Sequence, residues 1–526
     1  MSERGSSDAS GQGARLTAVA GMLAISVLLS RVLGFVRESV LAYQLGVSSA
    51  VDAYRAAFQI PDLLNYFLAG GALSIAFIPF YTRVRSEGGD DAAARFFAKL
   101  LGTLTLVSTL ATALLWWNAE ALVRVQFPAF DAETTALTVH LTRIVLPAQI
   151  FFVAGGVVRA LLMAHDRFRS QVLAPLLYNL GIIAGGGLLG GSLGAEGFAW
   201  GVLGGALLGT LLVPLVEVAR APELRLQIRV AFDRDFGRYL VVAAPLMLGV
   251  TLVTVDEWYD RWFGALLASG TVAALGYARI LMQIPVAAVG QAIGTAALPA
   301  FSKLWSEGRR DELNDVVLAT LRVGLGLALL AGAAFAALAE PVVELVYHRG
   351  AFDAAAAVTV AELLAIFSWA VPAWVTQQIA VRAFYARGDT WRPMLLGTGV
   401  AVVAIPLYLS LGPAYGARGL AFAGVFAMSV NALLTIAMAR AIHGAPDLGR
   451  LGVSGLRTAA VAVLAGVAAV AAKGAVAEWS ALVELAAGGA AFGAVGLAAT
   501  FSVGDRGLRD VVGSIGRRLA RVGRTG

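Results

Sequence analysis

The sequence predicts an all-α integral membrane protein built from two similar lobes, and three observations carry this prediction. Hydrophobic residues make up 59% of the 526 residues and charged residues only 14%, against about 45–50% and about 25% in soluble domains. Apolar stretches long enough to cross a bilayer recur along the chain, and a set of residues in the first half recurs in the second. Because so few charges cannot cover a surface in water, lipid must solvate most of this chain.

A bilayer core about 30 Å thick requires about 20 apolar residues in each helix that crosses it. The first qualifying segment has no small-residue cleavage site before Arg31, so we expect a retained helix rather than a signal peptide. Fourteen segments meet the requirement, and we expect transmembrane helices at 16–44, 55–81, 97–117, 137–164, 172–192, 197–219, 239–268, 272–300, 317–339, 357–384, 393–411, 417–440, 455–476 and 480–502.

The basic residues predict the orientation of these helices. Lys and Arg concentrate in the N-terminal arm (1–15), in alternate loops and in the C-terminal tail (504–526). Cytoplasmic loops carry the excess of basic residues in membrane proteins, so we expect both termini to be cytoplasmic. We interpret the net charge of +6 as anchoring near anionic lipid, not as binding of nucleic acid.

An internal repeat predicts how the helices are grouped. Two blocks of residues recur later in the chain: Arg55, Gln59, Ile60 and Pro61 as Arg279, Gln283, Ile284 and Pro285, then Pro79, Ser86, Glu87 and Gly88 as Pro299, Ser306, Glu307 and Gly308. Both copies end in a basic loop, which predicts two six-helix lobes related by a pseudo-two-fold axis along the membrane normal. We expect the first lobe within 16–225, the second within 226–445, and two added helices within 446–503.

Charged residues inside the expected spans predict the binding site. An arginine at a helix centre costs about 2.5–3.5 kcal/mol on insertion scales, yet the first span contains Arg31, Arg37 and Glu38. Asp52 and Arg55 stand near the start of the second span.

Arg31 and Arg37 share a helix face only if the helix bends near Gly34, and the adjacent Arg37 and Glu38 are expected to project in different directions. We expect the acids and arginines, with Arg279 from the second copy, to line a cationic chamber between the lobes. Guanidinium groups suit phosphate oxygens. The alternative is that single arginines extend to the membrane interface.

The seventh span carries a second anomaly. Asp256 and Asp260 are four residues apart, on one helix face. Two carboxylates there predict a site for Na⁺ or a proton. The alternative is that Asp260, Arg261 and Glu257 are hydrated near the outer surface.

Other local patterns do not indicate an enzyme. The run Gly190–Gly194 matches G-x-S-x-G but ends an apolar helix, without the strand and turn that a nucleophilic serine requires. No Walker A sequence is present, cysteine is absent and the four histidines have no metal-ligand spacing. We therefore expect neither catalysis nor a bound metal, and energy from a gradient, the membrane potential or a partner.

Several motifs resemble those of the MurJ/MviN family of lipid II flippases. They are Ser30–Ser39 (SRVLGFVRES), Ile60–Leu64 (IPDLL), Ala72–Pro79 (ALSIAFIP), Tyr277–Arg279 (YAR) and Phe384–Asp389 (FYARGD). The resemblance implies a fourteen-helix transporter of the inner membrane that moves an undecaprenyl-diphosphate-linked sugar, lipid II first, to the outer leaflet for peptidoglycan synthesis. It implies no cofactor beyond a coupling ion or the potential, and as partners the substrate, membrane lipids and cell-wall synthesis proteins.

The resemblance also assigns residues. It implies that Arg31, Arg37, Asp52 and Arg279 line the central cavity, and Glu38 stands where the family commonly has aspartate. The sequence departs from the family pattern at Gln59, Asn65, Tyr66 and Gly70, where charged residues are usual, so we expect a less charged cavity. A flippase for another polysaccharide-linked lipid, a cation-coupled multidrug exporter and a non-transporting scaffold remain alternatives.

Overall fold

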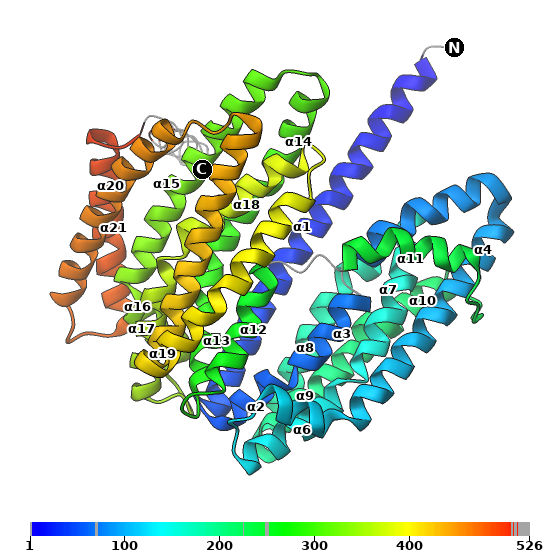
Figure 1. The fold of residues 1–526 in the computed structure, drawn as a ribbon, viewed down its shortest axis with the longest axis horizontal. Coiled ribbons are helices and arrows are strands. Elements are labelled where there is room, and N and C mark those ends of the chain that lie inside the picture. The colour runs from blue at the N-terminus through cyan, green and yellow to red at the C-terminus, as the bar shows by residue number, and fades with distance from the viewer. Residues whose placement is uncertain are drawn as a thin grey trace. The chain divides into compact units, whose positions relative to one another are not determined.

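The computed structural model describes residues 3–68, 72–224, 226–247, 252–505, 509 and 513, and every regular element among them is helical (Figure 1). This confirms the all-α class. The contacts between residues divide the chain into two compact units, Met1–Gly249 and Val250–Gly526. Gly70 and most of the basic tail lie outside the described residues.

Unit 1 contains the first eleven α-helices and one π-helical segment. They are α1 (Glu3–Leu45), α2 (Ser49–Ala57), α3 (Gln59–Leu68), α4 (Ala72–Trp117), α5 (Ala119–Gln126), α6 (Ala132–Val145), α7 (Ala148–Ala164), α8 (Arg169–Leu193), α9 (Ala195–Gly205), the π-helical η1 (Ala206–Leu212), α10 (Val213–Ala219) and α11 (Arg234–Met247).

Unit 2 contains ten α-helices and a second π-helical segment. They are α12 (Leu252–Gly264), α13 (Thr271–Pro285), the π-helical η2 (Val286–Gln291), α14 (Ala292–Ser306), α15 (Arg310–Ala337), α16 (Ala339–Tyr347), α17 (Ala354–Ser368), α18 (Val371–Tyr385), α19 (Trp391–His443), α20 (Leu448–Gly474) and α21 (Ala481–Ser502).

Within the described residues, nine helical segments are long and apolar enough to cross a membrane, or ten if the bent pair α17 and α18 is one span. The number is lower than fourteen partly because α19 contains two of the expected spans, and α4 contains one together with the end of the span expected at 55–81. The two parts of α4 meet at Gly89 (φ 74°) and those of α19 at Gly416 (φ 61°), where the backbone leaves the helical conformation. A positive φ favours glycine because it has no Cβ. The chain is thus a multi-pass membrane protein.

Glycines hold α8 against α9 in unit 1. A Cβ on Gly181 would lie 2.5 Å from the Cα of Gly205, and a Cβ on Gly185 would lie 2.6 Å from the Cα of Gly201. Membrane helices use such small residues to bring their backbones together, because lipid gives no hydrophobic drive for helix association. The close contact keeps α8 fixed, and α8 carries a residue of the first candidate site.

The expected seventh span, 239–268, falls in two elements of the structure, α11 and α12. Its first part lies in α11, which packs on α4 and α3 and buries Phe236 and Tyr239 in the core of unit 1. Its second part begins α12 of unit 2, and residues 248–251 lie outside the described residues. The division between the two units falls within this expected span, and the lobe boundary expected after residue 225 stays a prediction.

The structure also identifies a member of the repeat that the sequence analysis missed. Phe130–Ala132 and Phe352–Ala354 have the same sequence, Phe-Asp-Ala, before α6 and α17. Asp131 accepts a hydrogen bond from the backbone N of Thr134 at 2.7 Å, and Asp353 accepts one from the backbone N of Ala356 at 2.8 Å. Both aspartates thus cap the first turn of their helix.

Candidate functional site

The first candidate cluster lies in unit 1 and is centred on Glu38, which is 6% exposed on α1. Its Oε1 accepts a hydrogen bond from Nη2 of Arg37, and its Oε2 accepts one from Nη2 of Arg55 on α2, each at 2.8 Å. One buried carboxylate thus serves two guanidinium groups. The expectation that Arg37 and Glu38 project apart is wrong, since the long arginine side chain reaches back to its neighbour.

Asn179 is the residue of this cluster that the sequence analysis missed. Its Oδ1 accepts a hydrogen bond from Nη1 of Arg37 at 3.2 Å, and its Nδ2 donates to Oγ of Ser30 at 3.3 Å. Asn179 is buried on α8, a long apolar helix. A single amide inside an expected membrane span was the available signal, because a buried polar group needs a partner.

The other predicted residues of unit 1 differ in burial. Asp52 is 3% exposed and lies one helical turn before Arg55 on α2, whereas Arg31 is exposed on α1. Among the positions that depart from the family pattern, Gln59 is fully buried at the start of α3, and Asn65 and Tyr66 are partly buried farther along it.

The second candidate cluster lies in unit 2 and is centred on Arg279 of α13, which is 4% exposed. Its Nε donates to Oδ2 of Asp260 at 2.5 Å and its Nη1 donates to Oδ2 of Asp256. Both aspartates belong to α12 and are 2% and 4% exposed, so Asp260 is not a hydrated surface group, whereas Glu257 on the same helix is exposed. The two aspartates lie on one helix face, as predicted, and the group bound to them is the guanidinium of Arg279.

Aromatic residues enclose this second cluster. The guanidinium of Arg279 lies 4.7 Å from the ring centre of Phe367, a contact that favours a cation. The hydroxyl of Tyr408, on α19, donates to Oδ1 of Asp256 at 3.0 Å. The sequence analysis missed Tyr408, because a tyrosine in an apolar span gives no distinctive signal.

Arg31, Arg37, Glu38, Asp52 and Arg55 therefore belong to unit 1, and Asp256, Asp260 and Arg279 to unit 2. The structure brings Arg37, Glu38 and Arg55 into one cluster. It brings Asp256, Asp260 and Arg279 into a second. That both clusters line one chamber stays a prediction.

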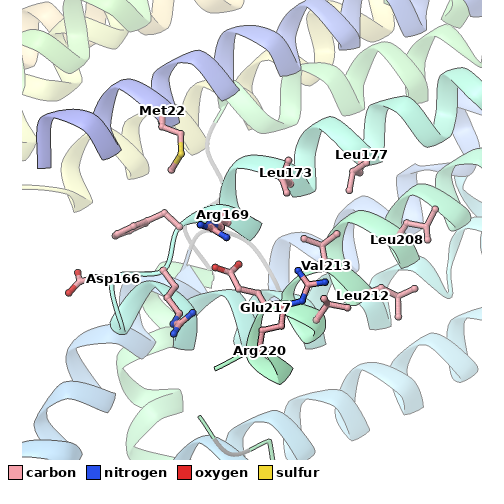
Figure 2. Close-up of a pocket in the computed structure, with 13 residues that line it drawn as sticks. Met22, Asp166, Arg169, Leu173, Leu177, Leu208, Leu212, Val213, Glu217 and Arg220 are labelled. Atoms are coloured by element: carbon pink, nitrogen blue, oxygen red, sulfur yellow. The ribbon is translucent and has the colours of Figure 1, made fainter. Parts of the chain in front are cut away.

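A groove of about 870 Å³ lies in unit 1 beside α1, α8, η1 and α10 (Figure 2). Leu173, Leu177, Leu208 and Leu212 form part of its apolar wall, and Arg169, Glu217 and Arg220 lie at its charged end.

Glu217 accepts a hydrogen bond from the backbone N of Ser170 at 2.8 Å. Within the described residues, the side chains of Arg169 and Arg220 form no hydrogen bond or ion pair. A basic end above an apolar wall is typical of places where lipid phosphates meet helix ends.

A larger groove, of about 1390 Å³, lies in unit 2 and is lined by α15, α18, α19 and α20. Its walls are almost entirely apolar, with Leu329, Trp369, Leu433 and Val467 among them. An apolar groove of this size suits a hydrocarbon chain, because burial of apolar surface is favourable wherever water is excluded.

The profile of the lipid II flippase MurJ family matches residues 41–488. This chain belongs to that family. The MurJ match confirms the resemblance seen in the motifs. The chain is 30% identical over 421 residues to the probable lipid II flippase MurJ of Rhizobium tropici, with 78% of each protein covered. It is 28% identical over 424 residues to the lipid II flippase MurJ of Burkholderia cenocepacia, covering 77% of this chain and 80% of that one.

Solved structures show the same fold. A lipid II flippase MurJ in an inward closed conformation gives a TM-score of 0.76 at 19% identity, covering 91% of this chain and 99% of that one. An inward-facing multidrug resistance MATE transporter of the MOP superfamily gives 0.68 at 14% identity, covering 80% and 98%. The MurJ family is a family of transporters, and the chain has their fold.

Proposed function

We propose that this chain carries lipid II, an undecaprenyl-diphosphate-linked sugar, from the cytoplasmic to the outer leaflet of the inner membrane for peptidoglycan synthesis. The observation that carries the proposal is membership of the lipid II flippase MurJ family over residues 41–488. Cell-wall synthesis proteins that consume the lipid on the outer face are the protein partners we expect.

The predicted arginines would bind the diphosphate. Arg31, Arg37 and Arg55 of the first lobe and Arg279 of the second are the candidate ligands, with Glu38 and Asp52 holding their neighbours in place. Guanidinium forks match phosphate oxygens in geometry and charge. Alternating access by the two lobes would then expose the head group first to the cytoplasm and later to the outer face.

The groove of unit 2 is the candidate site for the lipid tail. It lies against α20 and is lined by apolar residues. A prenyl chain there would stay out of water while the sugar crosses, so the protein would need to shield only the head group.

The membrane potential is the energy source we propose. Moving two negative charges outward across an inside-negative membrane gains about 4–5 kcal/mol per 100 mV. A coupling Na⁺ or proton at Asp256 and Asp260 is the alternative role for these acids, which in the structure bind Arg279. The distribution of Lys and Arg supports cytoplasmic termini.

The test is depletion of the protein in its host, with lipid II measured separately on the two faces of the membrane. We expect lipid II to accumulate on the cytoplasmic face and to return to the outer face when the protein is restored. A changed distribution of another polysaccharide-linked lipid would support that substrate instead. Altered drug sensitivity alone would indicate an exporter, and unchanged sidedness of every lipid would indicate a scaffold.

A further inference from the structure

Arg279 is a candidate substrate ligand, yet two acids already neutralise it. Its Nε and Nη1 donate to Asp260 and Asp256, and all three side chains are buried. Within the described residues, Nη2 of Arg279 and Oδ1 of Asp260 are buried without a hydrogen-bond partner. Two polar atoms of the cluster are therefore unsatisfied, although a buried polar atom without a partner is costly.

The acids are held in position by the helices behind them. Tyr408 donates to Asp256, and its ring stacks on Phe263 with centroids 5.1 Å apart. A Cβ on Gly424 would lie 3.1 Å from the Tyr408 hydroxyl and 3.4 Å from Oδ1 of Asp256. Because Gly424 has no Cβ, Tyr408 and Asp256 can both approach its helix closely, and they contact each other independently of Arg279.

The two carboxylates carry the charge of a diphosphate. Each offers an oxygen to the guanidinium, as two phosphate oxygens would, and together they bear two negative charges. A guanidinium binds carboxylate and phosphate in the same planar geometry. An incoming diphosphate can therefore replace the acids on Arg279 without leaving the arginine unpaired.

We propose that Asp256 and Asp260 are positioning residues that hold Arg279 as an internal substitute for the substrate, and that the diphosphate binds by exchange with them. This inference rests on the proposed transport of a lipid-linked diphosphate. The acids weaken substrate binding, because the substrate must displace them. They speed release on the outer face, because they recapture Arg279. Tyr408 stabilises Asp256 while the arginine is away.

The test is a double-mutant cycle on the purified full chain, with undecaprenyl diphosphate in detergent micelles as the binding probe and lipid II transport in vesicles as the second readout. We expect Asp256→Asn to bind the probe at least fivefold more tightly and to transport lipid II more slowly. In an Arg279→Ala background the same change should leave affinity unaltered. Tyr408→Phe should bind the probe about twofold more tightly. Because this variant retains the aromatic ring and its packing, it tests the proposal even if Asp256→Asn fails to fold.

Glu362→Gln is the matched control, because Glu362 forms an exposed ion pair with Arg418 in the same unit, and its affinity should equal that of the wild type. Weaker binding by Asp256→Asn, or the same effect with and without Arg279, would overturn the exchange. The exchange would also be overturned if Asp256→Asn kept its affinity for undecaprenyl diphosphate but its transport no longer depended on Na⁺ or protons. That result would assign the acids to a coupling ion. If the wild type neither binds the probe nor moves lipid II, the proposed function itself fails.

Discussion

The two copies of the repeat place an arginine at the same position but give it opposite surroundings. In unit 1, Arg55 and Arg37 both bind the carboxylate of Glu38. In unit 2, Arg279 has two carboxylates to itself. The predicted site residues of unit 1 comprise three arginines and two acids, whereas those of unit 2 comprise one arginine and two acids.

Under the proposed exchange, this difference would separate two tasks that a transporter of an anion must perform. The cluster with surplus positive charge would attract a diphosphate, and the cluster with surplus negative charge would favour its release. Both copies of the repeat carry the same arginine, so the number of acids around it is what differs. The arginine side chains of the first cluster are also more exposed to solvent. The exposed fraction is 29% for Arg37 and 15% for Arg55, against 5% for Arg279 in the second cluster.

The largest expected effect is that of Arg279→Ala. Removing the guanidinium leaves two buried carboxylates facing each other, and loss of one partner of a buried ion pair costs about 3–5 kcal/mol. We expect a loss of that order in the free energy of unfolding, together with loss of lipid II transport. Unfolding in detergent and the vesicle assay measure the two effects.

Arg418→Ala provides the control for this prediction. The Arg418–Glu362 pair lies in the same unit with side chains 62% and 41% exposed, and exposed pairs contribute about 0–1 kcal/mol. Stability should therefore change little. Equal losses in Arg279→Ala and Arg418→Ala would contradict the description of the unit 2 cluster as a desolvated triad.

The second prediction concerns Glu38→Gln, which removes the acid that two arginines share. We expect a loss of about 2 kcal/mol in the free energy of unfolding, between the values for exposed and buried pairs, because water can reach Arg37 and Arg55. The loss should be smaller than that of Arg279→Ala under the same conditions. A larger loss would mean that the first cluster is the drier of the two.

The sequence predicted the helices and the charged residue types because both follow from the cost of placing groups in lipid. Apolar runs located the spans, and arginines at bilayer depth had to have partners. It could not predict which acid would meet which arginine. Asp256 and Asp260 were predicted to bind a Na⁺ or a proton, which stays a prediction, and nothing in the sequence says that Arg279 of α13 lies beside them on α12.

Two further features could not be predicted from the sequence, because they also depend on which helices lie side by side. The role of Asn179 depends on α8 lying beside α1, which is a tertiary contact. The packing of α11, the first part of the expected span 239–268, against α4 and α3 is also a tertiary contact, which apolar length alone cannot show. Phe130–Ala132 and Phe352–Ala354 were visible in the sequence but too short to stand out from chance.

These paired caps give the third prediction. Asp353→Ala removes the acceptor for the backbone N of Ala356, and loss of an N-cap costs about 1 kcal/mol. We expect a decrease of that size in the free energy of unfolding and unchanged transport, since the cap lies at the start of α17 whereas Phe367, which contacts Arg279, lies near its end. Asp353→Asn, which can still accept the hydrogen bond, should retain most of the stability. Loss of transport in Asp353→Ala at unchanged stability would contradict a purely structural role.

The smallest expected effect is a pH dependence at the matching cap of unit 1. The hydrogen bond from the backbone N of Thr134 lowers the pKa of Asp131. Since the pKa of the folded state lies below that of the unfolded state, the carboxylate stabilises the protein above its unfolded pKa, and this stability disappears as pH falls through the folded pKa. The thermal midpoint of Asp131→Ala should therefore lie below that of the wild type at neutral pH and converge with it in acid. Asp131→Asn is the control, because it carries no titrating group: the difference in thermal midpoint between Asp131→Asn and Asp131→Ala should be the same at every pH. If the difference in thermal midpoint between the wild type and Asp131→Ala is also the same at every pH, ionisation of Asp131 contributes nothing to the cap.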